Sequence, residues 1–187
     1  MDTLDDVLLD VIEKMDNTGK VLKDQFSGLR TGKASPALVD GVQVMYYGVP
    51  TRLRDIANIS TPEPRLIVIS PYDPTALSEI EKAILAANLG VTPRNDGRVI
   101  RVPIPELNEE RRKEIVKVAK RQSEEARIAV RNVRREGNDL VKALQKDGKI
   151  TEDERDRGLE EVQKATDAHI AKIDHELKNK EAEVMAV

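Results

Sequence analysis

The chain has 187 residues, which is long enough to form one ordinary domain, or a domain with a small insert, around a buried core. It has no cysteine and therefore no disulfide, thiolate metal site or cysteine nucleophile. Charged residues make up 35% of the sequence and aromatic residues only 2%, which leaves Leu, Ile, Val and Ala to build a core, as in helical bundles. The net charge of -3 disfavours nucleic-acid binding by the chain as a whole, although recognition depends on how charge is distributed over individual faces.

The first thirty residues carry apolar side chains at helical spacing, namely Leu4, Leu8, Val11, Met15, Leu22 and Leu29. This period predicts a long amphipathic helix, which we expect to end near Thr31 and Gly32 because glycine commonly stops a helix and Pro36 follows. The N-terminal residues are acidic, unlike a signal or transit peptide, and no apolar run reaches the roughly 20 residues of a membrane span. We therefore expect a cytoplasmic protein without membrane contact.

Between residues 34 and 105 the sequence changes character. All nine prolines lie there, and the apolar runs are short and rich in β-branched residues, which favours strands at residues 41–47, 58–61, 66–70 and 98–102. One helix lies among them, capped by Asp73 and ended by Gly90. Tyr46 and Tyr47 would form a stacking platform for bases only if they shared a face, but neighbouring strand residues alternate, so we expect one to be buried.

Helical periodicity returns after Pro105. Asn108 is a suitable N-cap, and the second helix should run to about Lys146. A turn follows, after which Thr151 and Glu154 match a capping box that opens a third helix reaching nearly to the C-terminus.

One helix before the insert and two after it predict an α+β fold in which a long three-helix bundle is interrupted by a small β/α sandwich domain. We assign residues 1–30 and 106–187 to the bundle and residues 31–105 to the insert. The two connections would then lie side by side and form a two-stranded hinge that contains Thr31, Gly32, Pro103 and Pro105.

The second helix carries the sharpest functional signal, with ten Lys or Arg and three Glu between Arg111 and Arg135. Spacings of three and four place eight side chains on one face: Lys113, Lys117, Lys120, Glu124, Arg127, Arg131, Arg134 and Asn138. The stripe predicted to face the bundle comprises Ile115, Ala119, Gln122, Ala126, Ala129, Val133, Leu140 and Leu144. Arginine suits phosphates and stacked bases, yet a solvated face would look the same, so chemistry alone leaves both interpretations open.

Catalytic patterns are missing from the sequence: it has no Gly-rich phosphate loop, no plausible Ser-His-Asp order and no metal-type histidine cluster. His169 and His175 are six residues apart and so do not share a helix face as a ligand pair would. The sequence therefore predicts that the chain is not an enzyme and holds neither a metal nor a cofactor.

Four motifs follow one another along the chain: LRTGKASP at residues 29–36, YYG at 46–48, EERRK at 109–113 and VRNVRR at 130–135. With the length, the position of the insert and the acidic C-terminal end, they resemble the bacterial ribosome recycling factors. That resemblance implies an L-shaped monomer with a flexible hinge. It also implies that the chain binds post-termination 70S ribosomes through large-subunit rRNA and, with the GTPase elongation factor G, promotes subunit dissociation and release from mRNA.

Carried over position by position, the resemblance implies RNA contacts at Arg134, Arg131, Arg112, Arg30, Lys33, Arg135 and Arg127. Many relatives have arginine where this chain has Lys33, so a point charge replaces a bidentate contact there. Gly137 is unexplained by the sequence, since glycine inside a helix costs about 1 kcal/mol relative to alanine. Two rival functions stay open: a helical adaptor that binds another protein through its bundle, and an enzyme housed in the insert.

Overall fold

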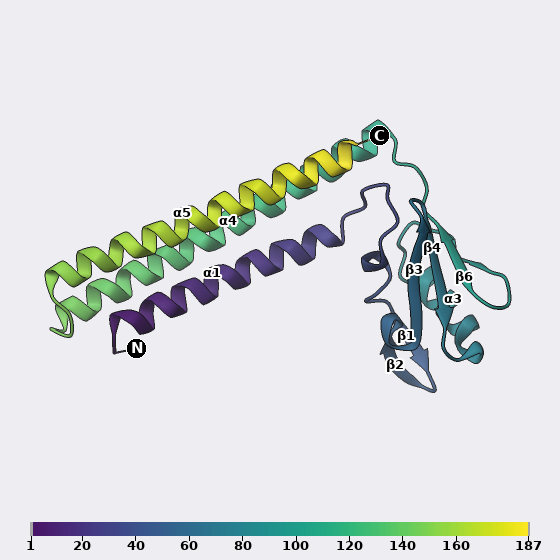
Figure 1. Cartoon of the computed structure of the whole chain (residues 1–187), viewed down its shortest axis with the longest axis horizontal. Coiled ribbons are helices and arrows are strands. Elements are labelled where there is room, and N and C mark those ends of the chain that lie inside the picture. The colour runs from purple at the N-terminus through teal and green to yellow at the C-terminus, as the bar shows by residue number, and fades with distance from the viewer. Residues whose placement is uncertain (1, 187) are drawn as a thin grey trace. The chain divides into compact units, whose positions relative to one another are not determined.

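The structure is a computed structural model that describes residues 2–186 (Figure 1). The chain forms two compact units. The helical unit comprises the described residues up to Leu29 and from Lys113 onward, and the inserted unit comprises Arg30–Arg112. Within the described residues, no helix combines the length and the apolarity needed to cross a membrane.

Three long helices make up most of the helical unit: α1 (Leu4–Ser27), α4 (Glu109–Lys146) and α5 (Glu152–Met185). The predicted capping box at Thr151 is present, because its hydroxyl accepts from the Glu154 amide at 3.1 Å and the Glu154 carboxylate accepts from the Thr151 amide at 2.8 Å. Helix α1 is shorter than predicted. It ends at Ser27 rather than near Thr31, and Gly28 is its C-cap.

The core of the helical unit is aliphatic and receives residues from all three helices. Val7, Val11 and Met15 of α1 pack with residues of α4 and α5 that include Val130, Val141, Val162 and Ile173. The predicted stripe on α4 is wrong in part, because Leu140 is 37% exposed while Val130 and Val141 are fully buried. The buried positions run one residue later than predicted, at Ser123, Val130 and Val141.

Gly137 lies in this core at a position that has no room for a side chain. A Cβ atom at this position would sit 2.6 Å from Val11 Cγ2 and 3.6 Å from Val162 Cγ1. Gly158 of α5 is similar, since its Cβ would meet Leu4 Cδ1 at 2.7 Å. Both glycines therefore let helices approach more closely than any side chain would allow.

The inserted unit contains two antiparallel sheets. Strands β1 (Gln43–Tyr46) and β2 (Val49–Arg52) form a hairpin. The second sheet has the strand order β3-β4-β6-β5, formed by Ala57–Glu63, Leu66–Pro71, Ile100–Pro103 and Arg94–Asn95. The four predicted strands correspond to β1, β3, β4 and β6, whereas β2 and the two-residue β5 lie outside the predicted strands. The helical segments are η1 (Pro36–Leu38), α2 (Leu53–Ile56), η2 (Pro74–Ala76) and α3 (Leu77–Ala86).

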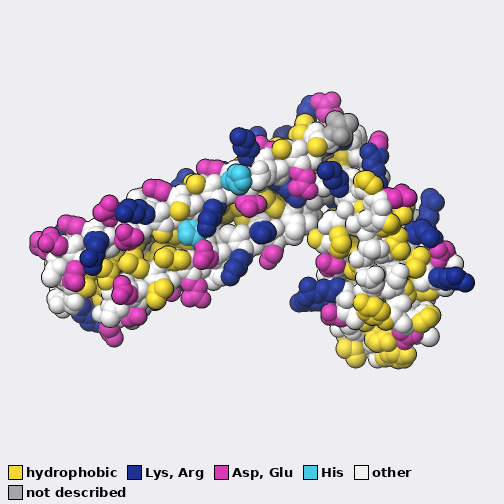
Figure 2. All heavy atoms as spheres, viewed as in Figure 1, with side chains coloured by type: hydrophobic (Ala, Val, Ile, Leu, Met, Phe, Trp, Pro, Cys, Tyr) yellow, Lys and Arg dark blue, Asp and Glu magenta, His cyan; other side chains and the backbone are white. Residues whose placement is uncertain are grey.

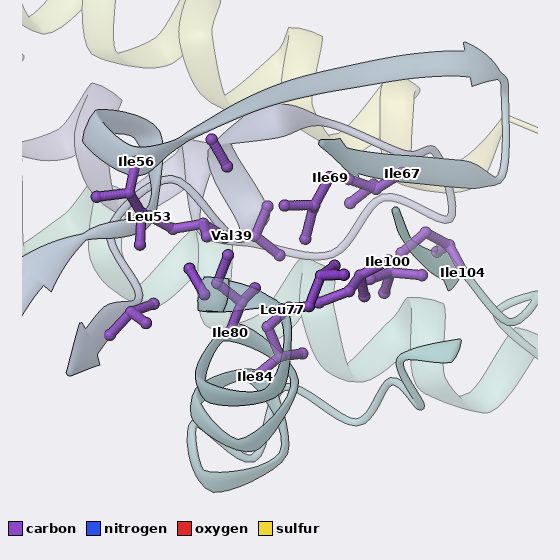
Figure 3. Packing of buried hydrophobic residues seen from close by; sticks show 14 residues of the cluster. Val39, Leu53, Ile56, Ile67, Ile69, Leu77, Ile80, Ile84, Ile100 and Ile104 are labelled. Atoms are coloured by element: carbon purple, nitrogen blue, oxygen red, sulfur yellow. The ribbon is translucent and has the colours of Figure 1, made fainter. Parts of the chain in front are cut away.

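A dense aliphatic core holds the inserted unit together (Figure 3). Ile67 and Ile69 of β4 and Ile100 of β6 alternate with outward residues and meet Ile80 and Ile84 of α3. All five side chains are fully buried, so this small unit has a core of its own.

The two segments predicted to form a hinge both contact the turn between β3 and β4. The amide of Ala34 donates to the Pro64 carbonyl at 2.6 Å, and the amide of Ile104 donates to the Arg65 carbonyl at 2.8 Å. Gly32 has φ +78°, and its α-carbon faces the Leu107 side chain. The first and second connections therefore lie beside each other within the inserted unit.

Candidate nucleic-acid interface

The seven residues predicted to contact RNA fall into two groups. The first group, which we call the α4 arginine face, lies in the helical unit and comprises Arg127, Arg131, Arg134 and Arg135. The second lies in the inserted unit and comprises Arg30, Lys33 and Arg112. The predicted RNA contacts are thus divided between two compact units rather than gathered on one.

Arg127 is held between two helices. Its Nε lies 2.8 Å from Asp174 Oδ1 of α5, and its Nη1 lies 3.0 Å from Glu124 Oε2 on α4. The side chain is only 19% exposed. Two carboxylates thus already balance this charge, so Arg127 offers less to a phosphate than its position in the sequence suggests.

Arg131 and Arg135 point to solvent. Arg131 is 47% exposed and pairs with Glu124, whose Oε1 lies 3.4 Å from Arg131 Nη1. Glu124 is shared with Arg127, so a single carboxylate faces two guanidinium groups. Arg135 is exposed. Both side chains are accessible to a polyanion.

Arg134 is half-buried and its partner is a neutral amide. Its Nη1 donates to Gln163 Oε1 of α5 at 3.2 Å, and Gln163 Nε2 in turn donates to Asp167 Oδ1 at 2.9 Å. Within the described residues, its Nε is buried without a hydrogen-bond partner, as is Oδ1 of Asn138 one turn later. The guanidinium is therefore held in place while its charge stays available.

The second group includes an arginine packed on the backbone. Arg30 Nη1 lies 2.9 Å from the place where a Cβ on Gly90 would be, and Gly90 has φ +71°. Any side chain at position 90 would displace the guanidinium. Arg30 and Arg112 also bury an Nε that finds no hydrogen-bond partner in the described part of the chain, while Lys33 is exposed.

Both histidines have hydrogen-bond partners. His169 Nε2 lies 2.7 Å from Asp16 Oδ1 of α1, and this contact lowers the pKa of Asp16. His175 Nε2 pairs with Asn179 at 3.1 Å. In the part of the chain that the structure describes, no three His, Cys, Asp or Glu residues gather as metal ligands would.

The sequence did not point to the contributions of α5. Asp174, Gln163 and Asp167 are three among many polar residues of that helix, and their spacing alone does not distinguish the ones that face α4. Only the packing of the two helices identifies them.

Comparison with known proteins decides the family. A family model described as ribosome recycling factor matches residues 22–185. The ribosome-recycling factor of Geobacillus kaustophilus is 54% identical over 94% of this chain and 95% of that protein. The factor of Syntrophomonas wolfei is 49% identical over 97% of this chain and 98% of that protein. The chain belongs to the ribosome recycling factor family.

Solved structures of ribosome recycling factors confirm the predicted fold class. A solution structure of the factor has a TM-score of 0.81 and 41% identity, and the match covers 98% of each chain. A second match has a TM-score of 0.68 and 41% identity, covering 98% of this chain and all of the other. That second structure places the Thermus thermophilus recycling factor and Escherichia coli elongation factor G on the Escherichia coli post-termination complex.

Proposed function

We propose that the chain acts as a ribosome recycling factor, binding post-termination 70S ribosomes through large-subunit rRNA and promoting subunit dissociation together with elongation factor G. Full-length similarity to recycling factors supports this proposal, and the α4 arginine face supplies the chemistry. The chain would act as a monomer in the cytoplasm. GTP hydrolysis by elongation factor G would supply the energy, so the chain itself needs no catalytic residue or cofactor.

The observation that supports the RNA contact is that Arg134 is held by a neutral amide and buries an Nε without a hydrogen-bond partner in the described residues. An unpaired buried donor costs about 1–3 kcal/mol, and Arg30, Arg112 and Arg134 each bury such an Nε. Burial of Nε fixes the side chain, which reduces the entropy lost when the remaining guanidinium donors bind phosphate. Arg131 and Arg135, one turn away or less, extend the same positive surface.

The test is binding of the purified protein to 70S ribosomes and to large subunits across a salt series. Neutralising one phosphate contact should weaken binding roughly tenfold and reduce the dependence of log affinity on log salt by about one unit. We expect this result for Arg134→Ala and for Arg131→Ala.

Arg121→Ala is the matched control. Arg121 lies on the same helix, is 69% exposed and pairs with Glu125, so its loss should leave affinity nearly unchanged. Undiminished binding by Arg131→Ala and Arg134→Ala would contradict the RNA face and favour a helical adaptor. No binding of the unaltered protein at low salt would overturn the recycling function itself.

A further inference from the structure

A hollow of about 250 Å³ lies between α1 and α5, within the helical unit. All of its lining residues belong to these two helices, so this α1–α5 hollow is separate from the α4 arginine face. Met15 and Leu22 of α1 and Ile173 of α5 form its apolar floor, and each is at most 3% exposed. Figure 2 shows hydrophobic side chains between the helices that Figure 1 labels α1 and α5, with histidine and Lys or Arg side chains beside them.

Three lysines, Lys20, Lys23 and Lys172, also line the hollow. All three are exposed, and none has an ion-pair partner among the described residues. Lys164 differs from them. It lines the neighbouring hollow between the same two helices and lies 3.5 Å from Glu161 Oε1. Lysine charges that no carboxylate offsets, placed beside an apolar surface, attract an anion that has an apolar part.

Two carboxylates line the hollow as well, and one of them already has a partner. Asp16 Oδ1 lies 2.7 Å from His169 Nε2, a contact that joins α1 to α5. The hydrogen bond to His169 first, and then the charges of Lys172 and Lys20, lower the pKa of Asp16. Three lysines against Asp16 and Glu176 leave a surplus of one positive charge, with His169 counted as neutral. This surplus suits a monoanion better than a phosphate dianion or a polyanion.

Gly19 of α1 lines the hollow at a position where helix propensity favours alanine. No atom of the described residues lies within 4 Å of a Cβ at this position. The close packing that explains Gly137 and Gly158 therefore does not explain Gly19. The absence of a side chain instead keeps the hollow open, and a larger residue at position 19 would occupy part of it.

The size of the α1–α5 hollow limits the ligand that it can take. An apolar cavity of roughly 150 Å³ binds benzene, so about 250 Å³ accommodates one aromatic ring or a short alkyl chain. We propose that the α1–α5 hollow binds a small organic monoanion, with a ring or chain against the apolar floor and a carboxylate between the three lysines. Such a ligand would contact both helices and stabilise their packing. The site is independent of the proposed function.

Hydrocinnamate, a carboxylate that carries one aromatic ring, is the probe for the full-length protein. We expect saturable binding with a dissociation constant of roughly 1 mM, a rise in melting temperature, and NMR shifts in the amides of α1 and α5 that surround the hollow. Hydrocinnamyl alcohol has the same ring without the charge, and acetate has the charge without the ring. Each should bind roughly tenfold more weakly or less.

Two variants test the space and the charge separately. Gly19→Leu should keep or raise the melting temperature of the free protein, since leucine favours a helix, and should weaken hydrocinnamate binding at least tenfold by filling the hollow. Lys172→Gln should weaken binding roughly threefold, as for one exposed ion pair. Lys164→Gln is the matched control, because Lys164 lies on the same helix and lines the neighbouring hollow, and it should bind as the unaltered protein does.

Four results would overturn the proposed site. They are no saturable binding of hydrocinnamate, equal affinity for its alcohol, undiminished binding by Gly19→Leu, and a loss in Lys164→Gln as large as the loss in Lys172→Gln. If Gly19→Leu does not fold, the comparison of the two lysine variants still decides. None of these results bears on ribosome binding, which rests on residues of α4.

Discussion

Arg134 is oriented by a neighbouring helix rather than by its own. Gln163 accepts from the arginine through Oε1 because its Nε2 is turned toward Asp167. An amide has one accepting and one donating end, so the Asp167 carboxylate decides which end the arginine meets. Gln163 is therefore a positioning residue for Arg134. Because Gln163 is neutral, it does not offset the positive charge of the guanidinium.

We predict that Gln163→Leu weakens ribosome binding about threefold, the effect of losing one modest hydrogen bond. The measurement is a double-mutant cycle with Arg134→Ala, in which affinity for 70S ribosomes is compared across the four proteins. In the Arg134→Ala background, Gln163→Leu should have no further effect. Gln25→Leu, at an exposed glutamine of α1, is the control. An equal loss in both backgrounds would show that Gln163 acts independently of Arg134.

At the level of the helices, Gly137 and Gly158 set how closely the three partners pack. Helix propensity by itself favours alanine at both positions by about 1 kcal/mol. The close approach of Val11 to position 137 opposes that preference, because Val11 is buried in the core and its Cγ2 would lie 2.6 Å from an added Cβ. Tight packing thus explains a glycine that intrinsic propensity disfavours.

We predict that Gly137→Ala lowers the free energy of unfolding by about 1–3 kcal/mol, since overpacking outweighs the gain in propensity. Gly19→Ala is the control. No atom of the described residues lies within 4 Å of a Cβ at position 19, so alanine there should raise stability by up to about 1 kcal/mol. The free energy of unfolding of both variants is measured by urea denaturation. Equal stabilisation of the two variants would refute the packing role of Gly137.

The β1–β2 hairpin is an element whose second strand lay outside the predicted ones. Val49 and Pro50 lie outside the predicted strand at residues 41–47, and proline usually disfavours strands. In the structure Pro50 pairs with Met45 in a two-stranded sheet, where no further described strand needs the missing amide. The turn is therefore only two residues long, and Tyr47 lies within it rather than on a strand.

For the whole molecule we propose that the connections at residues 28–35 and 104–108 act as a hinge, with Thr31, Gly32, Pro103 and Pro105 in or beside them. Neither of these segments, both of which the structure describes in full, contains a helix or a strand, and η1 begins directly after the first. Hinge motions are absorbed by a few loop residues of this kind, whose backbone dihedrals change when a partner binds.

We predict that energy transfer between dyes on the two units changes when elongation factor G joins the ribosome-bound protein. The sequence has no cysteine, so Val21→Cys in α1 and Leu85→Cys in α3 would be the only labelling sites. A pair inside the helical unit, Val21→Cys with Ile128→Cys, should show no change. Constant transfer in the first pair would rule out the hinge.

The sequence by itself determined the features that are encoded locally. Apolar periodicity predicted three long helices, turn residues and β-branched runs predicted the insert, and a capping box predicted the start of α5. The same spacing placed Arg127, Arg131 and Arg134 on one face, with Arg135 beside them. Each of these inferences needs only the rise and turn of one element.

Only the tertiary structure decided how those side chains are used. It paired Arg127 with Asp174, set Arg134 on Gln163, laid Arg30 over Gly90 and joined Tyr47 to Asp73. Each contact links residues far apart in the chain, and it depends on the packing of two elements. Periodicity carries no information about that packing, which is why residues of equal charge on one helix proved to have different partners.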